Sequence, residues 1–203
     1  MLKYIIIPFI VIFSVPEIFS QSNSLDSLLF TRINEHRDSI GLNKLSWDTS
    51  IYKASKHHAE YLVLLNSEEY QKKHNKYNIT SATHYEEVDF ENFEEFFDVD
   101  ERSKRYMGKS YHLCTENAAV VGARKSLTLE ILEDEKIVDR IINGWINSPG
   151  HKKNMEIESS KLGACSILLY DVAFKSKSGK IYYIKSAVAI FNADYVAKVT
   201  IVK

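Results

Sequence analysis

The sequence lacks an excess of charge of either sign. Its 26 Lys and Arg residues nearly balance 27 Asp and Glu residues, which leaves a formal net charge of −1 over 203 residues. The basic residues form no cluster of the kind that nucleic-acid-binding domains carry. A balanced chain has no broad electrostatic attraction to nucleic acid or to an anionic membrane. We therefore expect no nucleic-acid partner.

The sequence also lacks a convincing membrane span, because its sustained apolar run lies within residues 1–20. Lys3 supplies a positive start, and Ser20 supplies the small residue of a cleavage site. The alternative is a membrane anchor, but the run is short of the roughly 20 residues that a span needs, and Pro8 interrupts it. No Cys follows it as a lipid-attachment point. We predict a cleaved signal peptide, no stable membrane span after cleavage, and one domain over residues 21–203 that is secreted, extracellular or periplasmic.

Cysteine is scarce, with Cys114 and Cys165 as the two copies. An even count in an oxidising compartment permits one disulfide. The bond would close a loop of about 50 residues and stabilise the fold by about 3–4 kcal/mol. The alternative is two buried thiols, because free cysteine packs well as a small hydrophobe. We favour the disulfide, because both cysteines lie in or beside predicted strands.

Several common catalytic and metal-binding sequence motifs are absent from the chain. It contains no His-Glu-x-x-His sequence, no Gly-x-Ser-x-Gly sequence and no EF-hand loop. Ser148 is a poor candidate nucleophile, because it precedes a proline at a predicted helix end, where Ser is common for turn reasons. His57 and His58 have no partners at metal-ligand spacing, and we interpret them as hydrogen-bonded structural histidines.

The first two thirds of the chain carry helical periodicity. Apolar residues recur at spacings of three and four from Leu25 to Ile33, and again after Asp48, a candidate N-cap. A third apolar stripe runs from Ile137 to Trp145. These patterns predict three amphipathic helices with one buried face each.

Strand-like runs dominate the last third of the chain. We predict strands at residues 162–174 and 181–191, joined by a polar hairpin connection at 175–180, and a further strand at 195–202. A short buried strand at 118–121 comes earlier. Helices first and strands last argue for the α+β class, and we find no internal repeat.

Two polar segments lie in the middle of the chain. Residues 66–83 have no clear periodicity, which predicts an irregular loop. Residues 86–101 hold nine acidic side chains and no basic one, with phenylalanines at three- and four-residue spacing. We interpret this acidic segment as an amphipathic helix with solvated charges. The alternative is a Ca²⁺ site or a partner-binding face, since carboxylate oxygens suit Ca²⁺.

The most informative stretch runs from Trp145 to Met155 and reads Trp-Ile-Asn-Ser-Pro-Gly-His-Lys-Lys-Asn-Met. Pro149 breaks the preceding helix and Gly150 permits a turn, so we expect His151 at a fixed place on a rim and not along a helix face. This run resembles the second histidine motif of the CAP (SCP-like) superfamily, which includes cysteine-rich secretory proteins, venom antigen 5 and plant pathogenesis-related proteins. Bacterial secreted members usually read Trp-x-x-Ser-Pro-Gly-His-x-x-Asn, and this copy is close.

Two other segments extend the resemblance to roughly residues 25–193. The segment around Asn34 and Arg37 is similar to the opening helix and turn of CAP domains, where both residues look structural. Residues 114–119 resemble the Gly-Glu-Asn-Ile-Ala motif, with Thr115 where Gly is usual. The resemblance implies a three-layer α-β-α sandwich with a central antiparallel sheet.

The resemblance also gathers a candidate site from His84, Glu116 and His151, because the CAP cavity uses two histidines and two acidic residues. His84 is assigned by its order along the chain, after the second helix and a variable loop. The second acidic residue, expected shortly after Trp145, has no match here. Imidazoles and a carboxylate suit Zn²⁺ or another divalent metal, so we predict these three residues as candidate metal ligands.

Three functions are compatible with this site. We favour a secreted binding or interaction module whose cleft holds a divalent metal, a small ligand or part of an extracellular partner. The alternative is a metal-dependent, peptidase-like hydrolase in which Glu116 acts as the base. A third possibility is a polar cluster that only shapes the fold. Family members have also been linked to sterol or lipid binding, so a lipid is a further candidate ligand.

Overall fold

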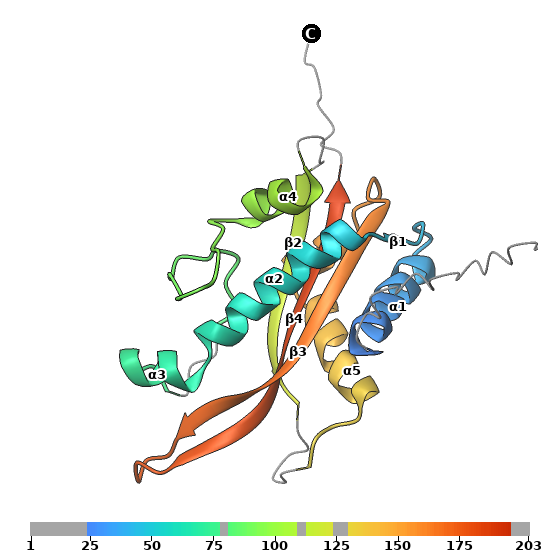
Figure 1. Cartoon of the computed structure of the whole chain (residues 1–203). Coiled ribbons are helices and arrows are strands. Elements are labelled where there is room, and N and C mark those ends of the chain that lie inside the picture. Colours follow the sequence, from blue (N-terminus) through green and yellow to red (C-terminus); the bar gives the residue numbers. More distant parts are fainter. Residues whose placement is uncertain (1–23, 78–80, 109–112, 124–129, 196–203) are drawn as a thin grey trace, which may run out of the picture.

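A single four-stranded sheet lies between two helical layers (Figure 1), and this computed structural model describes residues 24–77, 81–108, 113–123 and 130–195. The strand order is β1-β3-β4-β2. The strands are β1 (Ser46–Trp47), β2 (Leu113–Gly122), β3 (Leu162–Lys175) and β4 (Ile181–Tyr195). The β2–β4 and β3–β4 pairs are antiparallel, and the short β1–β3 pair is parallel. The predicted α+β class and three-layer sandwich are confirmed.

The helices divide between the two faces of the sheet. One face is covered by α1 (Ser24–Ser39) and α5 (Asp134–Ile146), and α6 (Pro149–Met155) follows α5. The other face is covered by α2 (Thr49–Leu65), with α4 (Val99–Met107) packed against α2 and β2. The short helix α3 (Glu68–His74) continues beyond α2 (Figure 1). It lies inside the segment for which we expected an irregular loop.

Helix α2 begins where its sequence signal predicts, and a glycine follows the end of α1. Asp48 is the N-cap of α2, and its carboxylate accepts hydrogen bonds from the backbone N–H groups of Ser50 and Ile51. Gly41 follows α1 with a φ of 79°, a left-handed conformation that favours glycine. The buried residues of α2 pack against β3 and β4.

Asn34 and Arg37 tie α1 to neighbouring loops, as the sequence predicts. The side-chain amide of Asn34 exchanges two hydrogen bonds with the backbone of Leu45, at 3.1 and 2.7 Å. The fully buried Arg37 guanidinium donates to the carbonyl oxygens of Asn43, Met155 and Ile157. Arg37 thereby holds the end of α6, and with it the segment that carries His151.

The acidic segment is not the predicted helix. Residues 86–97 form turns and loops, and helix α4 begins only at Val99. Carboxylates of this segment bind backbone N–H groups that a helix would use internally, because Glu95 accepts from Phe90 N at 2.6 Å and Glu86 accepts from Phe96 N at 2.8 Å. Acidic side chains that compete for the backbone override the periodicity of the phenylalanines.

The expected disulfide is also wrong, because Cys114 and Cys165 are both free and buried. Cys114 lies on β2 and Cys165 on β3, and β4 runs between these two strands. Two strand spacings separate their backbones by at least about 9–10 Å, and their β4 partners, Asp194 and Phe191, are three residues apart along that strand. That distance exceeds the limit of roughly 7 Å between Cα atoms that a disulfide can bridge.

The proline break at Pro149 is present, but it starts a new helix. Pro149 occupies the first turn of α6, where its missing N–H costs nothing, and Ser148 is the extended N-cap residue. His151 therefore lies on a short helix, which corrects the expectation that it would not. No helix among the described residues is long and apolar enough to cross a membrane. The predicted signal peptide and almost all of the strand predicted at 195–202 lie outside the described residues.

Candidate functional site

Glu116 is the central acidic residue of the site, on β2. It pairs in register with Asn192 of β4, whose side-chain amide donates to Glu116 Oε2 at 3.2 Å. The Asn154 side chain on α6 donates to the Glu116 carbonyl oxygen at 3.0 Å. The Glu116 side chain is 2% exposed, so its charge depends on partners within the protein.

Arg102 supplies the cation that two buried carboxylates share. Its guanidinium donates to Glu86 Oε1 at 2.7 Å and to Glu116 Oε2 at 2.8 Å. All three side chains are at most 2% exposed. Arg102 comes from α4, Glu86 from the loop after α3 and Glu116 from β2, so this bridge joins three separate segments.

His58 on α2 occupies the space between the same carboxylates. Its Nδ1 lies 2.7 Å from Glu86 Oε1, and its Nε2 lies 2.7 Å from the carbonyl oxygen of Thr83 and 3.6 Å from Glu116 Oε1. An ionised carboxylate and a backbone carbonyl can only accept hydrogen bonds. Both ring nitrogens of His58 therefore face hydrogen-bond acceptors. Glu86, Glu116, Arg102 and His58 together form a buried ionic cluster.

His57 lies between this buried ionic cluster and a group of aromatic side chains. Its Nδ1 lies 2.9 Å from the Tyr106 hydroxyl, and its Nε2 lies 3.5 Å from Glu86 Oε2. The ring packs against Phe93 and Phe96 with centroid separations of 4.5 and 5.0 Å. Both α2 histidines are thus hydrogen-bonded within the fold, as predicted.

The electrostatics of the cluster keep both carboxylates ionised. Burial opposes the charged form of Glu86, but hydrogen bonds from His57 and His58 and the Arg102 charge lower its pKa to about 2. Burial also opposes the charged form of Glu116. The charges of His58 and Arg102 and the hydrogen bond with His84 outweigh burial and lower the pKa of Glu116.

His84 is the exposed end of the cluster. Its Nδ1 lies 3.0 Å from Glu116 Oε1, while its side chain is 46% exposed. The Glu116 hydrogen bond raises the pKa of His84, and this effect outweighs the opposing effects of burial and of the Arg102 charge. The Nδ1 atom therefore donates to the carboxylate, and Nε2 is left as the nitrogen that can act on a ligand.

His151 is held next to this site by two asparagines. Asn117 of β2 donates to the His151 carbonyl oxygen at 2.9 Å, and Asn154 donates to Asn117 Oδ1 at 3.0 Å. Burial lowers the pKa of His151, and the charge of His84 lowers it further. His151 is partly exposed and favours its neutral form.

The structure brings His84 and Glu116 into direct contact and His151 to their neighbourhood, but it does not group all three. Within the described ranges, no three His, Cys, Asp or Glu side chains are arranged to hold a metal ion. Glu116 has both oxygens engaged by His84, Arg102 and Asn192, so it does not fit as a direct metal ligand. It fits the role of a carboxylate that orients a ligating histidine.

Sequence reasoning missed Glu86 and Arg102. Glu86 is one of nine acidic residues in a row without bases, so nothing local marks it as the buried one. Arg102 is the first basic residue after that run, which is a weak signal for a shared counter-ion. Their burial depends on contacts with α2 and β2, which lie far away in the sequence.

Comparisons with known proteins agree with this architecture. The CAP family, described as the cysteine-rich secretory protein family, matches residues 30–175. An extracellular protein containing an SCP domain from Bacillus anthracis has 17% identity and a TM-score of 0.51, over 86% of this chain and 41% of that chain, which indicates a shared fold. Curated proteins give no match.

Two further solved structures are similar at lower TM-scores. An outer surface protein from Borrelia burgdorferi has 21% identity and a TM-score of 0.44, over 84% of this chain and 92% of that chain. A cysteine-rich secretory protein from Staphylococcus aureus has 12% identity and a TM-score of 0.45, over 87% of this chain and 40% of that chain. The chain thus spans less than half of the Bacillus and Staphylococcus proteins.

Proposed function

This chain belongs to the cysteine-rich secretory protein (CAP) family, and from that premise we propose that it is an exported binding protein that presents His84 and His151 to a ligand. The observation that carries this proposal is that the two oxygens of Glu116 bind different partners. This carboxylate holds His84 by one oxygen and Arg102 by the other, while the His84 ring remains half exposed. The histidine rings are therefore accessible to a ligand, whereas the carboxylates are buried.

A divalent metal such as Zn²⁺ is the ligand that this arrangement supports best. A ligating histidine commonly donates its other ring N–H to a carboxylate, which fixes the ring and its tautomer. His84 has this arrangement toward Glu116, and His151 favours the neutral form that binds metal. We propose that His84 Nε2 and the His151 ring supply the two protein ligands, with the remaining positions open to solvent or to a group on a partner.

The hydrolase alternative has less support, because Glu116 is a poor general base. Its pKa is lowered, and its oxygens already accept hydrogen bonds from Arg102, His84 and Asn192. A catalytic base works best with a pKa near the operating pH and with a free lone pair in reach of water. The buried ionic cluster instead supports a structural role for the inner residues, with binding left to the two outer histidines.

Titration calorimetry with Zn²⁺ tests this proposal. The wild-type protein is expected to bind Zn²⁺, and His84→Ala and His151→Ala are each expected to lose that binding. His74→Ala is the matched control, because His74 is an exposed histidine on α3 outside the site. A folded wild type that binds no Zn²⁺, or equal binding by the wild type and His84→Ala, would show that the metal proposal is wrong.

A further inference from the structure

The β3–β4 hairpin extends beyond the helical layers and forms a protruding ribbon tip, which we define as residues 174–183. Figure 1 shows this two-stranded ribbon reaching past α2 and α5, at the opposite end of the molecule from α4. The turn at its end is well organised. The Ser176 N–H donates to the Lys180 carbonyl oxygen at 2.9 Å, and Gly179 adopts a φ of 82°. The tip is therefore a defined structural projection.

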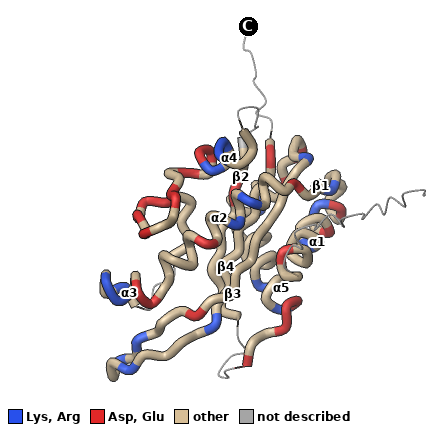
Figure 2. The backbone as a smooth tube through the Cα atoms, viewed as in Figure 1, with Lys and Arg blue, Asp and Glu red and all other residues tan. Residues whose placement is uncertain are grey.

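Positive charge is concentrated at this end of the molecule. Between residues 172 and 193 the chain has four lysines and no acidic residue. The lysines are Lys175, Lys177, Lys180 and Lys185, of which Lys185 pairs with Asp171 at 2.9 Å. The neighbouring helix α3 adds Lys72 and Lys73 in its last turn, and Figure 2 shows both basic groups on the same side of the molecule. The tip itself, residues 174–183, thus carries three lysines and no acidic residue, although the whole chain is nearly neutral.

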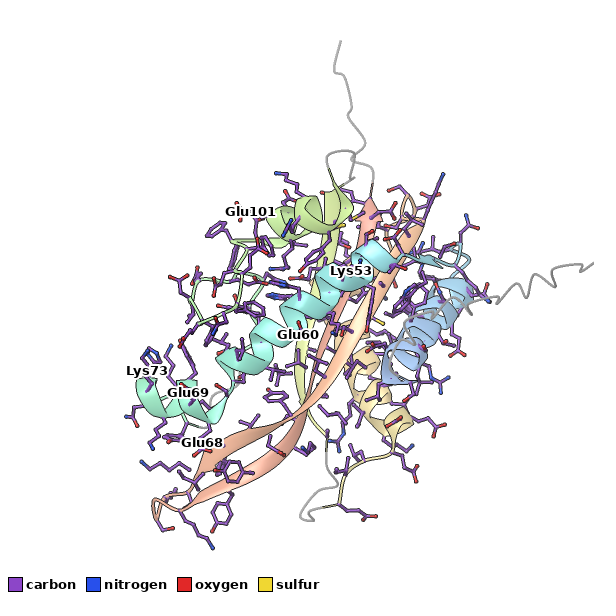
Figure 3. The ribbon with its side chains drawn as sticks, in the orientation of Figure 1. Lys53, Glu60, Glu68, Glu69, Lys73 and Glu101 are labelled. Carbon is purple, nitrogen blue, oxygen red and sulfur yellow. The ribbon has the colours of Figure 1, made fainter. Side chains whose placement is uncertain are left out.

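Helix α3 and the ribbon are connected by direct contacts. The Tyr183 hydroxyl donates to Glu68 of α3 at 2.6 Å, and the Lys175 ammonium group lies 5.4 Å from the centre of the Tyr77 ring, in the segment that follows α3. Figure 3 shows Glu68 and Lys73 on α3, beside the ribbon. The basic residues of the two elements therefore belong to one surface.

Exposed aromatic rings accompany these lysines. Phe174 and Tyr182 are directly opposite each other in the β3–β4 register, so their side chains share one face of the ribbon. They are 39% and 46% exposed, and Tyr183 is 52% exposed. The Lys180 ammonium group lies 5.1 Å from the centre of the Tyr182 ring. Phe174 and Tyr182 thus lie on one face of the ribbon with Lys180 over Tyr182, while Tyr183 and Lys175 lie on the opposite face. Both faces of the tip therefore carry exposed aromatic and cationic side chains.

We propose that this ribbon tip docks the protein onto an anionic lipid bilayer. Lysines near a membrane surface are attracted by anionic headgroups, and tyrosine and phenylalanine rings are stabilised at the boundary between headgroups and acyl chains. A free polyanion would use the lysines but would gain little from exposed Phe174. Because the tip and α4 lie at opposite ends, docking leaves the His84 site accessible from solution. This inference does not depend on metal binding.

Co-sedimentation with vesicles tests the docking surface. The exported protein is mixed with phosphatidylcholine vesicles, with and without phosphatidylglycerol, at low and high salt. Wild type is expected to bind only the phosphatidylglycerol vesicles, and less so at high salt. The double variant Lys177→Glu/Lys180→Glu should partition on the order of 30-fold more weakly, since each neutralised lysine weakens binding about fivefold and reversal adds repulsion.

Two controls separate the local surface from overall charge and from misfolding. Lys136→Glu/Lys153→Glu makes the same charge change on the exposed surface of α5 and α6 and should retain binding. Phe174→Ser/Tyr182→Ser should leave only weaker, more salt-sensitive binding, with circular dichroism confirming the fold. Equal loss in both lysine variants, equal binding to both kinds of vesicle, or binding to heparin without binding to vesicles would overturn the proposal.

Discussion

The side chains buried on the two faces of the sheet differ in polarity. The face that α1 and α5 cover is packed with apolar side chains, among them Ile33, Ile141 and Trp145, each at most 1% exposed. The face that α2 and α4 cover contains, beside its own apolar cluster, the buried ionic cluster around Glu86 and Arg102. The first face gains stability from burying apolar area, which is insensitive to pH. The second depends on charges that must remain paired.

The largest expected effect comes from removing the shared cation of the ionic face. Arg102→Met leaves Glu86 and Glu116 buried with too little positive charge and should lower the free energy of unfolding by about 3–5 kcal/mol. Urea unfolding at neutral pH measures this loss. Arg105→Met on the same helix is the matched control. Its pair with Glu94 is 3.5 Å long and exposed, so it should cost less than about 1 kcal/mol. A loss in Arg102→Met no greater than that of the control would contradict the ionic cluster's importance.

A cavity on the apolar face should have a slightly smaller effect with a different pH dependence. Ile141→Ala removes a fully packed side chain and should cost about 3 kcal/mol through lost burial and a residual cavity. This cost should be the same at pH 5 and pH 7. The cost of Arg102→Met should instead shrink at the lower pH, because protonation relieves the unpaired carboxylates. Parallel pH dependence of the two variants would remove the distinction between the faces.

The smallest expected effect concerns the acid stability that Glu86 provides. Its pKa is about 2 in the folded protein against an ordinary value of 4.5. Since the folded pKa is depressed, the stabilisation is present above pH 4.5 and is lost as pH falls toward 2. Glu86→Gln should reduce the loss of stability over this window by about 2 kcal/mol. Urea midpoints at pH 5, 4 and 3 would measure it, with Glu87→Gln, an exposed neighbour, as control. An unchanged pH profile would mean that Glu86 titrates normally.

The apolar face was predictable because its information is local. The stripe from Ile137 to Trp145 identifies α5 and its buried side directly, and all five residues of that stripe are buried. The Asp48 cap and the paired strands β3 and β4 were equally clear. Periodicity and turn chemistry are short-range properties, so a single sequence displays them.

The ionic face was only partly predictable because its partners come from distant segments. The motif resemblance found His84, Glu116 and His151, but it could not show that Glu116 binds Arg102 and faces inward. The acidic segment looked helical because its phenylalanines have helical spacing. The structure uses Glu86 and Glu95 to bind backbone N–H groups instead, a choice that depends on a tertiary context.

The place of β4 in the sheet has a consequence for when the chain can fold. β4 is the last strand among the described residues, yet it lies between β2 and β3 and pairs with both along most of its length. Until β4 is available, β2 lacks its partner and β3 can pair only with the two-residue strand β1, so the sheet that both helical layers cover is incomplete. Pairing across so many residues is slow. If residues 1–20 direct export, the chain would remain unfolded during its passage and complete its fold only on the far side of the membrane.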